Sequence, residues 1–151
     1  MGTMRLLVLP FVALVLVAAC SSSSECTLVA CQTGVHYQSP IRFTGAADSV
    51  ALTVCRNGVC AHGSASEGGC SLSGSIDVTC AISPANASST TIAFDVPAAI
   101  DDVKSGDTYT FRAQRGATNE TLVDVTKPAT YATLQPNGPS CPPTCKYVDL
   151  T

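Results

Sequence analysis

The sequence of this 151-residue chain predicts an all-β fold in which two sheets pack as a sandwich. Short segments alternate between apolar and polar side chains, which is the period of a strand with one buried face. Turn-forming residues recur about every 8 to 12 residues, and no segment has a convincing long helical pattern. These observations indicate about nine or ten short strands. Nine cysteines add the expectation that disulfides stabilise the fold.

The first strands are predicted from short apolar segments. Residues 27–30 and 41–44 are two candidates, separated by a glycine and a proline. Residues 49–54 then alternate cleanly, so that two valines and a leucine share one face. This third segment is the best-defined strand in the first half of the chain.

Asn57-Gly58 follows directly and is the strongest short hairpin signal, because a type I′ turn needs positive φ at both central residues. With those two residues as the loop, Cys55 lies opposite Cys60 in a non-hydrogen-bonded pair, where Cα atoms approach to about 4.5 Å. That separation is within disulfide range, so we predict a Cys55–Cys60 bridge. The alternative for this spacing is a metal site shared with other cysteines.

The middle of the chain predicts a loop followed by two strands. Residues 61–75 are rich in Gly and Ser and indicate the loop. Residues 76–82 and 90–96 alternate as strands with a turn between them. A bridge between Cys70 and Cys80 would close the Gly/Ser loop against the first of these strands.

Residues 98–104 favour one helical turn, and residues 108–113 form another strand with Tyr109 and Phe111 on one face. The preceding Ser-Gly-Asp corner, followed by a strand that carries a tyrosine at its second position, resembles the immunoglobulin-like domains and their corner tyrosine. The resemblance implies an immunoglobulin-like β-sandwich. Phe111 stands where that family has its second cysteine, and the chain has no tryptophan. The resemblance is therefore to the sandwich architecture in general, without the family's inter-sheet disulfide.

Three further strands are predicted at residues 121–125, 130–134 and 146–150. The last two flank a loop rich in Pro, Gly and Cys and resemble a terminal hairpin with a rigid cap. Four cysteines near the two ends of the domain remain, and either each neighbouring pair closes locally or the ends are stapled together. The cysteines concerned are Cys26, Cys31, Cys141 and Cys145.

The first residues have the pattern of a secretory signal. Arg5 supplies a positive charge, and residues 6–19 form an apolar run that is too short for a bilayer span and stops at a serine tract. The run ends at Val17-Ala18-Ala19-Cys20, which resembles the lipobox of bacterial lipoproteins. The resemblance implies that the thiol of Cys20 is diacylated, that residues 1–19 are cleaved off, and that the new amino terminus often takes a third acyl chain, such as palmitate.

This interpretation divides the chain into a signal peptide (1–19), a lipidated cysteine with a Ser-rich tether (20–26), and one disulfide-rich domain (27–151). Assigning Cys20 to lipid leaves eight cysteines, an even number suited to four disulfides. Two acyl chains give stable attachment, so the expected location is outside the cytoplasm, lipid-anchored to the cell membrane. Because Ser21 rather than aspartate follows, the resemblance implies the outer membrane if the host is a diderm bacterium.

Composition narrows the expected partners. The chain carries a net charge of −3, and cleavage would remove Arg5 and make it more acidic by one charge. A mildly acidic chain without a basic run argues against nucleic acid as a partner. With no Trp and 5% aromatic residues, a stacking platform for bases or sugars is not expected. The expected partners are the membrane, through Cys20, and proteins of the envelope or the extracellular space.

No residue pattern predicts a catalytic set, a metal site or a cofactor. The two histidines, His36 and His62, are interpreted as surface residues of loops. Asp101, Asp102 and Asp107 offer oxygen ligands of the kind that calcium uses, but they lack the Asp-x-Asp-x-Asp-Gly order and are interpreted as a solvated acidic turn.

The sequence therefore predicts an exported lipoprotein that acts as a non-catalytic binding or structural module of the cell envelope. One alternative is a small exported enzyme or metal-binding protein that uses His36, His62 and nearby Cys or Asp residues. Another is a secreted eukaryotic cysteine-rich domain without lipid, glycosylated at Asn86 or Asn119.

Overall fold

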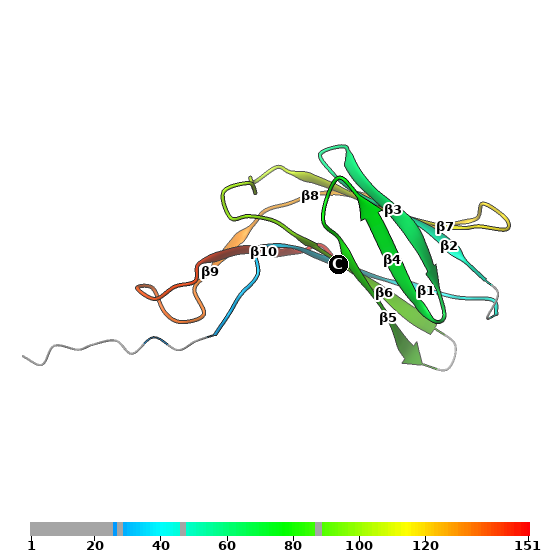
Figure 1. Ribbon diagram of the computed structural model, residues 1–151, viewed down its shortest axis with the longest axis horizontal. Helices are drawn as coiled ribbons and strands as arrows, with labels where there is room; N and C mark the ends of the chain where they lie inside the picture. The colour runs from blue at the N-terminus through cyan, green and yellow to red at the C-terminus, as the bar shows by residue number, and fades with distance from the viewer. Residues whose placement is uncertain (1–25, 27–28, 46–47, 87–88) are drawn as a thin grey trace, which may run out of the picture.

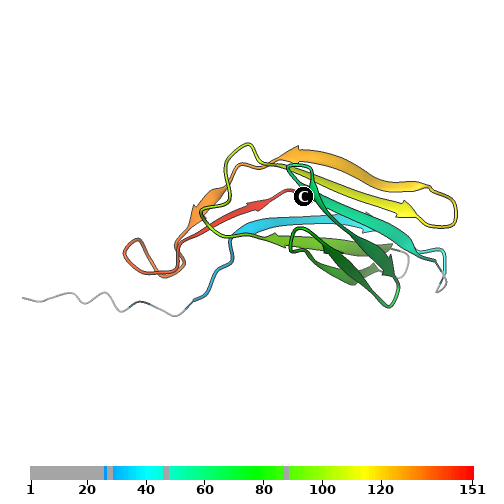
Figure 2. The same cartoon turned by 45° about the horizontal axis from the view of Figure 1, so that its top comes forward.

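The computed structural model describes residues 26, 29–45, 48–86 and 89–151. In this part of the chain ten strands form two five-stranded sheets that share one core (Figures 1 and 2). The strand order is β5-β6-β1-β10-β9 in one sheet and β4-β3-β2-β7-β8 in the other. The strands are β1 (Gly34–Ile41), β2 (Val50–Arg56), β3 (Val59–Ser66), β4 (Gly69–Gly74), β5 (Thr79–Asn86), β6 (Ser89–Pro97), β7 (Thr108–Arg115), β8 (Thr121–Pro128), β9 (Ala132–Leu134) and β10 (Cys145–Asp149).

The predicted all-β sandwich is confirmed, and its strand order follows the immunoglobulin-like pattern. In that family the variable-type sheet has the order C″-C′-C-F-G, and strands B, E and D lie in the other sheet. The order β4-β3-β2-β7-β8 matches C″-C′-C-F-G, and the order β1-β6-β5 matches B-E-D. The matched strands also follow one another along the chain in the same sequence as the lettered strands. The difference lies beside β1, where the C-terminal strand β10 pairs in parallel, from Gly34 opposite Tyr147 to His36 opposite Asp149.

The core lies between the sheets and is formed by the predicted inward faces. The alternating apolar residues of β2, β6 and β7 are buried, as the alternation predicts: Val50, Leu52, Val54, Ile92, Phe94, Val96, Tyr109, Phe111 and Ala113. The Phe111 ring of β7 stacks on the Tyr37 ring of β1 with centroids 4.2 Å apart. Because β1 and β7 belong to different sheets, this aromatic stack joins the two sheets across the core.

The first predicted strands are wrong in position. Residues 29–30 and 42–44 are not in strands, residues 27–28 lie outside the described residues, and β1 occupies the interval between the two predicted segments. Pro40 falls inside β1, where it pairs with β6 only, since β10 pairs no further than His36. A proline is tolerated at such a position because its missing N–H faces no neighbouring strand.

The predicted Gly/Ser loop of residues 61–75 is also wrong, because most of it belongs to the β3–β4 hairpin. A Cβ atom added to Gly63 would lie 1.8 Å from the backbone oxygen of Ser71, and one added to Gly74 would lie 2.5 Å from the Cα of Ala61. These two positions therefore require glycine, because the neighbouring strand comes too close for a side chain. The glycine content that suggests a loop is explained here by the packing of two strands. Residues 98–104 contain a single turn, closed by Asp102 N–H donating to the Ala99 carbonyl, and no helix.

Candidate functional site

Four disulfides connect eight of the nine cysteines. The Cys55–Cys60 pair spans the Asn57-Gly58 hairpin with a Cα–Cα distance of 4.0 Å, and Cys70–Cys80 joins β4 to β5, which are the two pairs expected from the sequence. The other two bridges decide between the alternatives for the terminal cysteines, because the ends of the domain are stapled together. They are Cys26–Cys141 and Cys31–Cys145, with Cα–Cα distances of 5.5 and 6.1 Å.

These two bridges close one end of the long axis of the molecule, called here the stapled end (Cys26, residues 29–33 and residues 134–145). Figure 1 shows the N-terminal segment and the β9–β10 loop together at this end, opposite the β7–β8 turn. The Asn137 side chain accepts a hydrogen bond from Val29 N–H and donates one to Val29 C=O, both 3.0 Å, and donates another to Pro142 C=O. The Asn137 amide thus hydrogen-bonds to both backbone groups of Val29, as a neighbouring strand would, and fixes the N-terminal segment to the β9–β10 loop.

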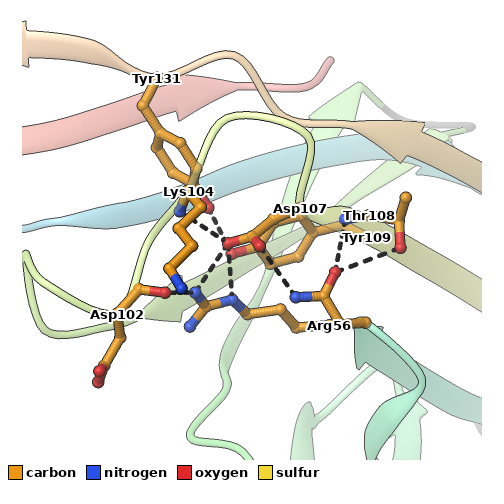
Figure 3. A network of polar contacts seen from close by, with 8 residues as sticks. Arg56, Asp102, Lys104, Asp107, Thr108, Tyr109 and Tyr131 are labelled. Atoms are coloured by element: carbon orange, nitrogen blue, oxygen red, sulfur yellow. Dashed lines mark hydrogen bonds and ion pairs between the residues drawn. The ribbon is translucent and has the colours of Figure 1, made fainter.

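A polar network ties the β2–β3 hairpin to the start of β7 (Figure 3). The Asp107 carboxylate accepts hydrogen bonds from Arg56 Nη2 at 2.7 Å, Asn57 Nδ2 at 2.9 Å and Lys104 N–H at 3.1 Å. The Asn57 carbonyl oxygen in turn accepts from Thr108 N–H at 2.9 Å. Asn57 has a φ of 51°, the left-handed conformation that the hairpin turn requires. Asn57 therefore forms the predicted turn with its backbone and links that turn to the start of β7 with its side chain.

The network holds Asp107 in its charged form. Burial raises the pKa of this carboxyl, but the hydrogen bonds from Asn57 and Arg56 outweigh burial and hold the pKa below its ordinary value. Beside it, burial raises the pKa of Tyr109, whose hydroxyl lies 2.6 Å from the hydroxyl of Tyr131. Because donors from three residues already engage the Asp107 carboxylate, it serves to position the hairpin.

The pH dependence of stability tests this role. The folded-state pKa of Asp107 is lowered, so its stabilisation is present above the ordinary value of 3.8 and is lost as the pH falls through the lowered folded value. We expect Asp107→Asn to lower the free energy of unfolding by about 1–3 kcal/mol at pH 7, and the gap to the wild type to narrow below about pH 4. Urea unfolding between pH 7 and pH 2.5 measures this, with Asp124→Asn in an exposed ion pair as the control. A gap that stays constant across this range would contradict the assignment.

A second buried ion cluster lies at the other end of β7. The side chain of Arg115 is 9% exposed and pairs with the 6%-exposed carboxylate of Asp48 and, at 2.9 Å, with Glu120. Arg115 also donates to the Arg42 carbonyl at 3.1 Å, and Asp48 accepts from Thr44 N–H at 2.8 Å. The cluster therefore anchors the β1–β2 loop to the β7–β8 turn. Arg115 was not predicted as buried, although the inward alternation of β7 extends to its position.

The residues considered for catalysis or metal binding are not brought together. His36 lies in β1, with its Nδ1 atom 2.8 Å from Asp95 Oδ1, whereas His62 lies in β3 of the other sheet, with its Nδ1 atom 3.1 Å from the Thr53 hydroxyl. The prediction that both lie in loops is therefore wrong. Across the described ranges, no group of three or more His, Cys, Asp or Glu side chains has the geometry to hold a metal ion.

The acidic residues also separate. Asp101 and Asp102 are exposed, but Asp107 is buried in the polar network, so the three do not form the predicted solvated turn.

Cys20 and the rest of the predicted signal and lipobox lie outside the described residues. Within the described part of the chain, no helix is long and apolar enough to cross a membrane. Comparison with known proteins finds no protein-family model, no curated protein and no solved structure that matches this chain.

Proposed function

We propose that this protein is an exported lipoprotein, anchored by lipid at Cys20, whose folded domain is a non-catalytic binding or structural module of the cell envelope. The observation that carries the proposal is the cysteine count. Four disulfides use eight of the nine cysteines, and the ninth is Cys20, the residue at the acylation position of the lipobox-like sequence. A thiol consumed by lipid explains an odd number in an exported chain.

The positions of the disulfides support the same proposal. A mechanical force on the anchor acts on the domain first at Cys26, and the Cys26–Cys141 disulfide transmits this force to the β9–β10 loop. The Cys31–Cys145 bond adds a second covalent link, to the first residue of β10. A tethered domain braced in this way resists being peeled open from its N-terminus.

Metabolic labelling with palmitate in the native bacterial host tests the anchor. We expect wild-type protein to incorporate label and the Cys20→Ala variant to incorporate none, because acylation requires the thiol. Ser21→Ala is the matched control, since it leaves the thiol in place and should label like the wild type.

Mass spectrometry of the unreduced mature protein provides an independent readout. The expected chain begins at residue 20 and contains four disulfides. Label that persists in Cys20→Ala, or a mature chain that begins upstream of residue 20, would refute the proposal.

A further inference from the structure

We propose that the stapled end lies directly against the bilayer and makes shallow apolar contacts with it, so that this end of the sandwich is a membrane-contact surface. The inference rests on the proposed lipid anchor at Cys20. It adds an orientation of the folded domain and a second contact with lipid.

The length of the tether places the stapled end near the membrane. Five residues separate Cys20 from Cys26. Fully extended, this stretch spans about 20 Å at most. The Cys26–Cys141 disulfide then fixes the end of the tether to the β9–β10 loop. The β7–β8 turn lies at the opposite end of the long axis, so the tether holds the stapled end closer to the bilayer than that turn (Figures 1 and 2).

The chemistry of the stapled end suits a lipid surface. Residues 26–35 and 128–145 contain no charged side chain, in a chain whose net charge is −3. Three large hydrophobic side chains are exposed in the described part of the molecule, and two of them, Val29 at 51% and Leu134 at 42%, lie at this end. Exposed prolines in the β9–β10 loop extend the apolar surface: Pro136, Pro139 and Pro142.

Electrostatics and rigidity favour the same orientation. Anionic lipid headgroups repel the acidic parts of the domain, and an uncharged end approaches the membrane at the least cost. The two disulfides and the Asn137 hydrogen bonds already hold Val29 and the loop in place. Little conformational freedom is therefore lost when this surface meets lipid. Burial of such side chains in the headgroup region adds to the binding that the acyl chains provide.

Single tryptophans test the contact, because the natural chain has none. The mature lipidated protein, as Leu134→Trp, is reconstituted into phosphatidylcholine vesicles with brominated acyl chains, which quench tryptophan on contact. Ala117→Trp is the matched control, because Ala117 is exposed and lies in the β7–β8 turn, at the opposite end of the long axis. We expect quenching to remove about half of the emission of the Leu134→Trp variant and little of that of the Ala117→Trp variant, since surface contacts reach about 5–10 Å into the bilayer.

Vesicle flotation separates failure of this inference from failure of the proposed function. Protein that does not float with vesicles has no lipid anchor, and the proposed function fails together with the inference. Protein that floats but shows equal quenching in the two variants retains its anchor and overturns the membrane contact. A blue shift of the Leu134→Trp emission without quenching indicates contact with a second copy and overturns it as well. Val29→Trp repeats the test from the other chain segment if Leu134→Trp does not form its four disulfides.

Discussion

Replacing Arg115 with alanine should lower the free energy of unfolding by about 3–5 kcal/mol, because the change leaves the buried Asp48 carboxylate without its cation. Among the described residues, Thr44 would remain the one donor to the Asp48 carboxylate, and the Arg42 carbonyl would lose the hydrogen bond from Arg115. The penalty arises from the uncompensated buried charge. Chemical denaturation with the disulfides intact measures the difference.

Arg112 provides a matched control on the same strand. It lies three residues earlier on the opposite face of β7 and pairs with Asp124 at 3.2 Å, with both side chains nearly half exposed. We expect Arg112→Ala to cost at most about 1 kcal/mol, since exposed ion pairs are screened by water. Arg115→Lys should fall between the two, because it keeps the charge but loses the fork of donors. Equal losses in free energy of unfolding for Arg115→Ala and Arg112→Ala would show that the buried cluster around Arg115 stabilises the fold no more than an exposed ion pair does.

The parts of this fold that were predictable depend on local rules. Asn57-Gly58 sets the register of its hairpin, and that register places Cys55 opposite Cys60. The buried faces of β2, β6 and β7 follow from strict alternation of apolar and polar residues, which indicates a strand with one face in the core. In these segments propensity, pattern and turn chemistry agree, so sequence alone identifies the element.

The parts that were not predictable depend on contacts between distant segments. Gly63 and Gly74 resemble loop residues until the neighbouring strand is seen to occupy the space that a side chain would take. Arg115 resembles a surface residue until Asp48, from a distant loop, is placed beside it. The position of β1 depends on its partners β6 and β10, the second of which begins more than 100 residues later.

The same limit applies to the candidate site. Local spacing was sufficient for the Cys55–Cys60 and Cys70–Cys80 bridges, which close short segments. The terminal cysteines could not be paired from spacing, because their partners are 114 and 115 residues away and the parallel pairing of β1 with β10 brings them together. The buried state of Asp107 likewise depends on Arg56 and Asn57 from another hairpin.

The two terminal disulfides should show strong non-additivity when they are removed. Each closes a loop of about the whole domain, with separations of 115 and 114 residues. Either bridge alone restricts the unfolded chain by about 5 kcal/mol at this loop length. Once one has formed, the second closes only a small ring of residues 26–31 and 141–145, which is worth about 2–3 kcal/mol.

We therefore expect Cys26→Ala/Cys141→Ala and Cys31→Ala/Cys145→Ala each to lower the free energy of unfolding by about 2–3 kcal/mol, and the quadruple variant to lower it by about 7 kcal/mol. Denaturation under non-reducing conditions completes this cycle. Cys55→Ala/Cys60→Ala is the control, because its five-residue separation gives about 2 kcal/mol that adds independently to either change. If the losses in free energy of unfolding for the two terminal disulfides sum to the loss of the quadruple variant, the two disulfides do not share one loop in the unfolded chain. In that case the stapled end would have to stabilise the domain through native contacts such as those of Asn137.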